Sequence, residues 1–155
     1  MATSDQEATP QTGRTMSRRT KAILYGIMAV ISLAGLADAT YLTVTHLTGD
    51  NLVCGESAGC SAVLGSAYAS FAGIPTAGFG VMAYFAAFSL AILATFGYAR
   101  ARVFLILLVT GMFIASLGFL YLQAFVLHAF CPYCLLSAAL TFFLAGLLVA
   151  SPPAR

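Results

Sequence analysis

Four long apolar stretches, broken by very few charges, limit what this chain can fold into. They run over roughly residues 22–47, 76–97, 103–127 and 132–150, and a transmembrane helix needs about 20 apolar residues. Of the 155 residues, 61% are apolar and only 8% are charged, whereas soluble domains have about 45–50% and 25%. The sequence therefore predicts an all-α membrane protein, a four-transmembrane-helix bundle with no room for a separate soluble domain.

The basic residues predict how these spans are oriented. Lys and Arg that flank membrane spans stay on the cytoplasmic side. We therefore expect a multi-pass protein of the cytoplasmic membrane with both termini in the cytoplasm, and with the 48–75 loop and the 128–131 turn on the outer side. Residues 1–21, of which 1–13 read as disordered, and 151–155 are the expected cytoplasmic tails around a 22–150 membrane domain. The basic residues that flank the spans in this way are Arg14, Arg18, Arg19, Lys21, Arg100, Arg102 and Arg155.

A signal peptide is an alternative interpretation of the first apolar stretch, because Ala37-Asp38-Ala39 resembles a cleavage site. The apolar character resumes at Tyr41, which favours an intact first span.

In the outer loop, the first half is polar and glycine-rich, as in flexible connections. The second half, residues 61–71, reads as a short interfacial helix that ends before Pro75.

Four cysteines, Cys54, Cys60, Cys131 and Cys134, all fall on the expected outer side. That side is oxidising in bacteria, so thiol–disulfide chemistry is the default there. Pro132 suits the first position of a helix, which makes Cys131 the expected N-cap and puts Cys134 in the first turn. A helix N-terminus stabilises a thiolate and lowers the pKa of cysteines in Cys-x-x-Cys motifs.

The spacing of the other pair favours exchange. Cys54 and Cys60 enclose five residues, two of them glycines, so this loop pair is mobile enough to pass a disulfide to the second pair. Two alternatives stay open: each pair is a structural disulfide, or the four cysteines hold zinc. The spacing of Cys54 and Cys60 does not fit a zinc site, so we expect no metal.

Electrons that leave a cysteine pair at the membrane edge need an acceptor, and a lipid-soluble quinone can enter from the bilayer. Phe119, Tyr121 and Phe130 also lie near the outer span ends, where aromatic residues commonly form the interfacial belt. Asp38 lies within a span, and an ionisable residue at such depth commonly has a function. His128 is a candidate proton relay to the quinone, and the sequence does not decide the role of either residue. The residues expected to bind the quinone are Leu64, Ser66, Thr76, Tyr84, Phe125, His128 and Leu135.

Together, these motifs make the chain resemble a bacterial member of the vitamin K epoxide reductase family over about residues 20–150. The features that carry the resemblance are the Cys54/Cys60 loop pair, the Cys60–Ser66 segment, Gly73-Ile74-Pro75, Gly80 with Tyr84, and Cys131-Pro132-Tyr133-Cys134. The order of the pairs also discriminates between families. In the DsbB-like oxidases, the Cys-x-x-Cys motif comes in the first outer loop, which is the reverse of the order here.

The resemblance implies a quinone-dependent thiol oxidoreductase that supports disulfide formation. A separate DsbA-like, thioredoxin-fold protein would pass electrons to Cys54/Cys60, then to Cys131/Cys134, and finally to ubiquinone or menaquinone. Cys134 would face the quinone and Cys131 would exchange with a loop cysteine. Thr76 and Ala138 stand where the animal enzymes have asparagine and tyrosine, which disfavours the first alternative, epoxide reduction of the animal type. The second alternative is a non-catalytic bundle braced by disulfides.

Overall fold

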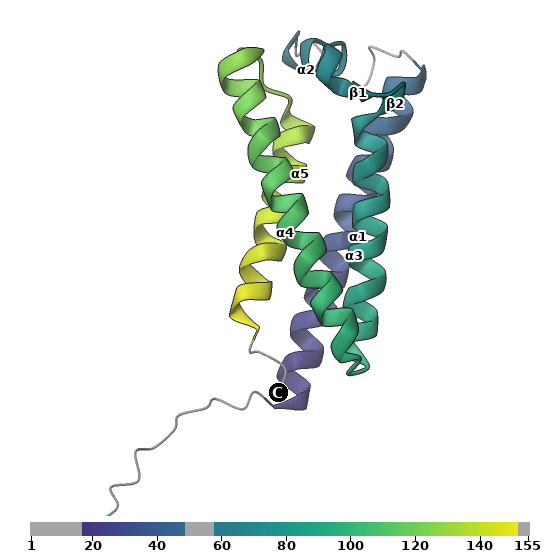
Figure 1. Ribbon diagram of the computed structural model, residues 1–155, viewed down its shortest axis with the longest axis vertical. Helices are drawn as coiled ribbons and strands as arrows, with labels where there is room; N and C mark the ends of the chain where they lie inside the picture. Colours follow the sequence, from purple (N-terminus) through teal and green to yellow (C-terminus); the bar gives the residue numbers. More distant parts are fainter. Residues whose placement is uncertain (1–16, 49–57, 152–155) are drawn as a thin grey trace, which may run out of the picture.

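The chain forms a bundle of four long helices in a computed structural model that describes residues 17–48 and 58–151 (Figure 1). The helices are α1 (Arg18–Thr48), α3 (Thr76–Thr95), α4 (Ala99–Tyr121) and α5 (Pro132–Ala150), and α4 continues into a π-helical turn, η2 (Leu122–Val126). All four are long and apolar enough to cross a membrane. The predicted all-α, four-helix membrane bundle is confirmed.

Two helices begin earlier than their apolar stretches. α1 starts at Arg18, so residues 18–21, expected in the tail, are helical, and α4 starts at Ala99 and includes Arg100 and Arg102. Lys and Arg are good helix formers, and their long side chains carry the charge away from the apolar region. A helix therefore continues past the end of its hydrophobic stretch. The rest of the expected N-terminal tail, the first half of the outer loop and most of the C-terminal tail lie outside the described residues.

The segment before α3 differs from the single short helix expected over residues 61–71. The helix α2 covers Ala58–Leu64, and after a 3₁₀ turn a two-stranded hairpin follows, β1 (Ser70–Phe71) and β2 (Ile74–Pro75). Ala72 and Gly73 connect the strands with φ angles of 53° and 80°. Positive φ at both central residues is the geometry of a type I′ hairpin turn. The prediction of a helix was wrong from residue 65 onward, because an alanine gives little sign of a left-handed backbone.

The bundle has two distinct ends. α2, the hairpin and the start of α5 lie together at one end, here called the loop end, at the top of Figure 1. The opposite, basic end carries the start of α1 and the short 96–98 connection between α3 and α4. There the Arg102 guanidinium donates a hydrogen bond to the Ser151 carbonyl (3.0 Å), and the hydroxyls of Tyr25 and Ser151 lie 3.3 Å apart. These contacts tie α1, α4 and the end of α5 together.

Small residues set the distance between α1 and α3, the pair of helices with the most extensive contact. Gly35 lies against the ring of Tyr84, so closely that a Cβ at Gly35 would overlap the ring. Ala87 and Ala91 continue the same contact surface and are fully buried. Small residues allow membrane helices to approach closely. The position of Tyr84 inside the bundle therefore depends on the absence of a side chain at Gly35.

Replacing Gly35 by alanine is expected to destabilise the bundle. The new methyl group would push the Tyr84 ring away from α1, and overpacking of this kind costs about 1–3 kcal/mol. Thermal unfolding in detergent measures the effect as a lower midpoint. Gly26→Ala in the same helix is the matched control, because nothing lies within 4 Å of a Cβ at that position. Equal midpoints for the two variants would contradict the close contact.

Candidate active site

The Cys-x-x-Cys motif forms the start of α5. Pro132 occupies the first turn and Cys131 is the N-cap, with φ −97° and ψ 116°. The sequence predicts this cap because proline has no N–H to lose at that position and its φ is already helical. Cys131 is completely buried, and its backbone N–H donates a hydrogen bond to Oε1 of Gln123 (2.9 Å).

Gln123 is a site residue that the sequence reasoning missed. It lies in the π-helical turn η2 and is 1% exposed. Its side chain accepts from Cys131, and its own carbonyl accepts from the N–H of Ala129 (3.1 Å). Gln123 thus holds both sides of the tight turn between α4 and α5. The available signal was a lone amide in an otherwise apolar span, because a polar group at such depth needs a partner.

Cys131 faces the loop helix α2. Val63 of α2 and Cys131 form a small buried cluster, with Leu64 and Leu127 packed against it. In the same contact, a Cβ at Gly59 would overlap the carbonyl oxygen of Phe130. The backbone of α2 therefore touches the residue that precedes Cys131. Cys60 directly follows Gly59 in α2, whereas the side chain of Cys60 and all of Cys54 lie outside the described residues.

The two cysteines of the motif interact with each other. The Cys134 thiol donates a hydrogen bond to the Cys131 sulfur, and this bond is the largest effect that lowers the pKa of Cys131, to about 7. The backbone N–H groups of Cys134 and Tyr133 at the start of α5 act in the same direction, and burial opposes them. Hydrogen bonds to a charged form favour that form. Reduced Cys131 is therefore partly a thiolate at neutral pH, as a nucleophile in disulfide exchange must be.

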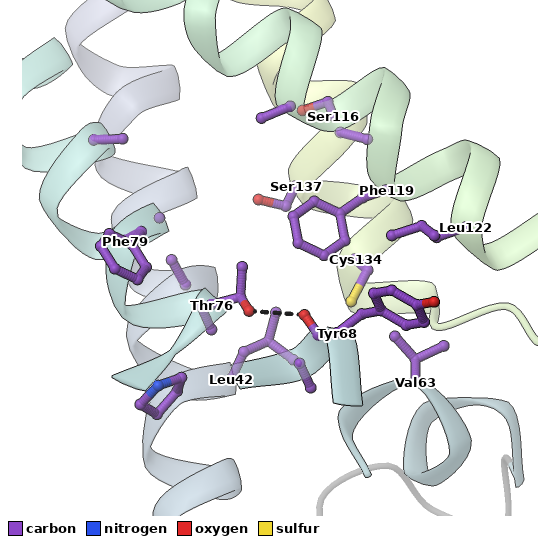
Figure 2. A pocket seen from close by; sticks show the side chains of 18 of the residues that line it. Leu42, Val63, Tyr68, Thr76, Phe79, Ser116, Phe119, Leu122, Cys134 and Ser137 are labelled. Carbon is purple, nitrogen blue, oxygen red and sulfur yellow. Dashed lines mark hydrogen bonds between the residues drawn. The ribbon is translucent and has the colours of Figure 1, made fainter. Parts of the chain in front are cut away.

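Cys134 lines a cavity of about 850 Å³ at the loop end. α1, α3, α4, α5 and the segment between α2 and α3 all contribute to its walls. Figure 2 shows the Cys134 sulfur among these side chains, near Tyr68 and Phe119. Cys131 does not line the cavity. The motif therefore presents one sulfur to α2 and the other to an apolar space whose size is typical of small-molecule sites.

Four of the residues expected around a quinone line this cavity: Leu64, Ser66, Thr76 and Tyr84. Two of the hydroxyls donate hydrogen bonds to backbone carbonyls of α2 and of the 3₁₀ turn that follows it. Ser66 Oγ donates to the Val63 carbonyl (2.7 Å), and Thr76 Oγ1 donates to the Tyr68 carbonyl (3.0 Å; Figure 2). Phe119 and Ala138 also line the cavity. Further lining residues that the sequence did not single out include Leu42, Val63, Tyr68, Phe79, Ser116, Leu122, Ser137 and Thr141.

Three other expected residues lie away from the cavity. Phe125 is exposed and stacks on Tyr121, with ring centroids 5.0 Å apart. Leu135 follows Cys134 directly, and one residue is about 100° of rotation around a helix, so its side chain is on the outer face of α5. His128 is exposed in the turn, with φ 47°. These three residues do not belong to the cavity wall. The π-helical turn η2 sets the direction of Phe125, the turn after it that of His128, and the rotation of α5 that of Leu135.

The hydroxyl of Tyr84 joins α3 to α5 at the cavity wall. It donates to the Ser137 carbonyl (2.7 Å) and lies 3.1 Å from Ser137 Oγ and 3.0 Å from Thr141 Oγ1. Tyr84 is almost completely buried, so these bonds replace water for its hydroxyl. Across residues 17–48 and 58–151, no three or more His, Cys, Asp and Glu side chains come together in a way that could hold a metal ion.

A comparison with protein families assigns the chain to a known group. The model of the vitamin K epoxide reductase family matches residues 26–149, which include all four cysteines. The chain belongs to the vitamin K epoxide reductase family. This family consists of oxidoreductases associated with quinones and thiols. The Cys-x-x-Cys pair, with Cys131 buried and Cys134 beside an apolar cavity, is therefore the candidate redox centre of a vitamin K epoxide reductase family protein.

The interaction between the two sulfurs predicts a pH dependence. Because the pKa of Cys131 is lowered mainly by the Cys134 thiol, Cys134→Ala should move thiolate formation at Cys131 to higher pH. Cys134→Ser, which keeps an O–H donor, should move it less. The measurement is the ultraviolet absorbance of the thiolate against pH, in reduced protein with Cys54 and Cys60 replaced by alanine. The same midpoint in all variants would exclude the hydrogen bond as the cause.

Proposed function

We propose that this protein is a quinone-dependent oxidase of protein thiols that supports disulfide formation. The observation that carries the proposal is that the two cysteines of the Cys-x-x-Cys motif have different surroundings. Cys131 packs against α2, and Cys134 faces an apolar cavity of about 850 Å³. This arrangement supports exchange of Cys131 with a loop disulfide and contact of Cys134 with a lipid-soluble acceptor.

The proposed electron path begins at the loop cysteines. A reduced partner protein passes two electrons to the Cys54–Cys60 disulfide through a mixed disulfide. The loop dithiol then reduces the Cys131–Cys134 disulfide, and that dithiol reduces the quinone to a quinol while its own disulfide forms again. The contact between Gly59 and the Phe130 carbonyl supports Cys60 as the loop cysteine that exchanges with Cys131.

The cavity suits the ring of ubiquinone or menaquinone. Its walls are mainly apolar, with Leu42, Phe79 and Phe119 among them, and apolar walls with a few polar groups are typical of small-molecule sites. The hydroxyls of Ser66, Thr76 and Tyr84 are the polar groups on the wall that we propose as ligands of the quinone. Each hydroxyl donates its hydrogen to a backbone carbonyl, which holds its oxygen in place on the wall. As held, this oxygen can accept a hydrogen bond from the O–H of a quinol, and the hydroxyl must rotate away from the carbonyl to donate to a quinone oxygen.

The charge distribution supports an orientation with the active site outside the cytoplasm. Among the described residues, the basic side chains belong to the start of α1 and of α4, at the end of the bundle opposite α2 (Figure 1). The positive-inside rule puts that end in the cytoplasm. α2 and the start of α5 then face an oxidising compartment, where a separate DsbA-like, thioredoxin-fold protein is the proposed partner.

Quinone reduction is tested with Cys134→Ala. Wild-type protein, reduced and kept anaerobic, should lose free thiols and form quinol when a short-chain ubiquinone is added, whereas the variant should form none because no second sulfur closes the disulfide. Intact mass after alkylation counts the thiols, and absorbance follows the quinol. A disulfide-braced, non-catalytic bundle predicts instead a lower unfolding midpoint in the variant and no quinol from the wild type.

Incubation with vitamin K epoxide and dithiothreitol tests epoxide reduction, which we expect to be absent.

The exchange between the loop and Cys131 is tested with Gly59→Ala. The added methyl group would overlap the Phe130 carbonyl and move α2 away from Cys131. Misplacing reacting groups by about 1 Å can cost on the order of 100-fold in rate. We expect slower transfer from the loop dithiol, measured by rapid quenching with acid and alkylation. Gly78→Ala is the control, because its Cβ would be 3.8 Å from the Ile74 side chain, an ordinary contact; equal rates in both variants would reject the proposed route.

A further inference from the structure

A carboxyl group is buried in the bundle beside the candidate redox centre. Asp38 lies in the second half of α1 and is 8% exposed. Its Oδ2 atom is inaccessible and has no hydrogen-bond partner among the residues that the structure describes. A buried carboxyl without full hydrogen bonding is costly, and an ionisable residue inside a membrane span commonly has a function. The electron path described above gives Asp38 no role.

The neighbours of Asp38 connect it to the cavity. The side chain of Ser137 is the polar group that contacts its carboxyl. Ser137 lies one helical turn after Cys134 on α5, and residues three apart share a helix face. Ser137 lines the cavity together with Cys134, whereas Asp38 does not. Ser137 therefore stands between the buried carboxyl and the cavity.

The titratable groups around Asp38 are thiols and a phenol. Tyr84 of α3, and Cys131 and Cys134 at the start of α5, are close enough for the charge of Asp38 to act on them. His46 lines the cavity from α1, eight residues further along. Lys21 precedes Asp38 by 17 residues in the same helix, which is about 25 Å along the axis. Arg18 and Arg19 lie further back in α1, and Arg100 and Arg102 begin α4 at the same basic end of the bundle. No described Lys or Arg is thus in a position to neutralise this carboxylate.

This environment favours a single negative charge. Two anions close together in a medium of low dielectric constant repel strongly, so a thiolate at Cys134 and a carboxylate at Asp38 disfavour each other. Moving a proton from the Cys134 thiol to Asp38 removes the conflict, because the total charge of the pair does not change. The same proton can return toward the cavity through the Ser137 hydroxyl.

We infer that Asp38 is a proton-transfer residue for the reduction of quinone at Cys134, with Ser137 as the link to the cavity. The inference rests on the proposed function. In the reaction, the Cys131–Cys134 dithiol loses two electrons and two protons as its S–S bond forms, and the quinone gains both electrons and both protons to become a quinol. The Cys134 proton travels by way of Asp38 and Ser137. The quinol takes its second proton from water, which balances the proton that Cys131 released to water when its thiolate formed.

The test is the rate of quinol formation by Asp38→Asn. The fully reduced variant is mixed anaerobically with a short-chain ubiquinone over a range of pH, in a stopped-flow instrument. Asparagine keeps the size of aspartate but accepts no proton. Acid–base groups typically contribute on the order of 100 to 10,000-fold, so we expect a loss of about 100-fold. The pH dependence that the carboxyl contributes should also disappear, while transfer from the loop dithiol to the Cys131–Cys134 disulfide keeps its rate. Asp38→Glu should restore part of the rate.

Two further variants separate proton transfer from structural support. Ser32→Ala removes another buried polar group of α1, whose hydroxyl bonds to the Met28 carbonyl (2.8 Å), and should leave the rate unchanged. Ser137→Ala leaves Asp38 in place but removes the link, so it should slow quinol formation and enlarge the solvent deuterium isotope effect. It also provides the decisive measurement if Asp38→Asn does not fold, which the unfolding midpoint reveals.

The outcomes distinguish the two hypotheses. If the wild type forms no quinol, the proposed function itself fails. If the wild type forms quinol and Asp38→Asn matches its rate and pH profile, the proposed function stands and the role of Asp38 is rejected. A wild-type rate and isotope effect in Ser137→Ala likewise reject the inferred path.

Discussion

The hydrogen bond from the Cys131 N–H to Gln123 fixes the position on which the rest of the site depends. It is a bond between two buried groups, and an unpaired buried N–H would cost about 1–3 kcal/mol. It holds the N-cap of α5 against the π-helical turn η2 that follows α4, so that the helix begins at a defined point and rotation. Cys131 then meets α2, and Cys134, less than one turn later, meets the cavity. A helix that started one residue away would turn both sulfurs by about 100°.

The cavity and the polar groups beside it combine two opposite environments. Leu, Phe and Ala side chains make most of the wall, which suits an apolar ring, while Tyr84, Ser137 and Thr141 concentrate their hydroxyls in one place on α3 and α5. The close approach at Gly35 makes this possible, because it lets the Tyr84 ring cross the bundle beside α1 and reach α5. Packing between helices thus determines where the hydrogen bonds of the site can form.

The sequence predicted the large-scale features because they depend on hydropathy and on one proline. Four apolar stretches were enough for the bundle, and Pro132 was enough for the cap at Cys131. The wall of the cavity was harder, because helices that are apolar all round do not reveal which face is inside. Leu64 and Tyr84 were placed on the wall by their nearness to the outer ends. Phe125 and Leu135 had the same nearness but point outward, since the π turn η2 and the rotation of α5 decide their direction.

Two further features had weak signals in the sequence. The hairpin needs a left-handed backbone at Ala72, a conformation that alanine rarely adopts, so the residues themselves favoured a helix. Gln123 and Ser137 acquire their importance only through partners far away or on another helix. Such partners are a property of the folded chain, and a linear pattern does not contain them.

The short connection between α3 and α4 has a consequence for how the cavity communicates with its surroundings. The two helices are close at the 96–98 turn and separate toward the loop end (Figure 1). Two side chains that line the cavity from these helices, Phe79 and Leu107, are also 49% and 64% exposed, so the other described residues leave much of their surface uncovered. In a bilayer, that surface meets hydrocarbon. The rate at which a molecule enters the cavity from this side then depends on its partitioning, that is, on its concentration in the lipid phase more than on its concentration in water.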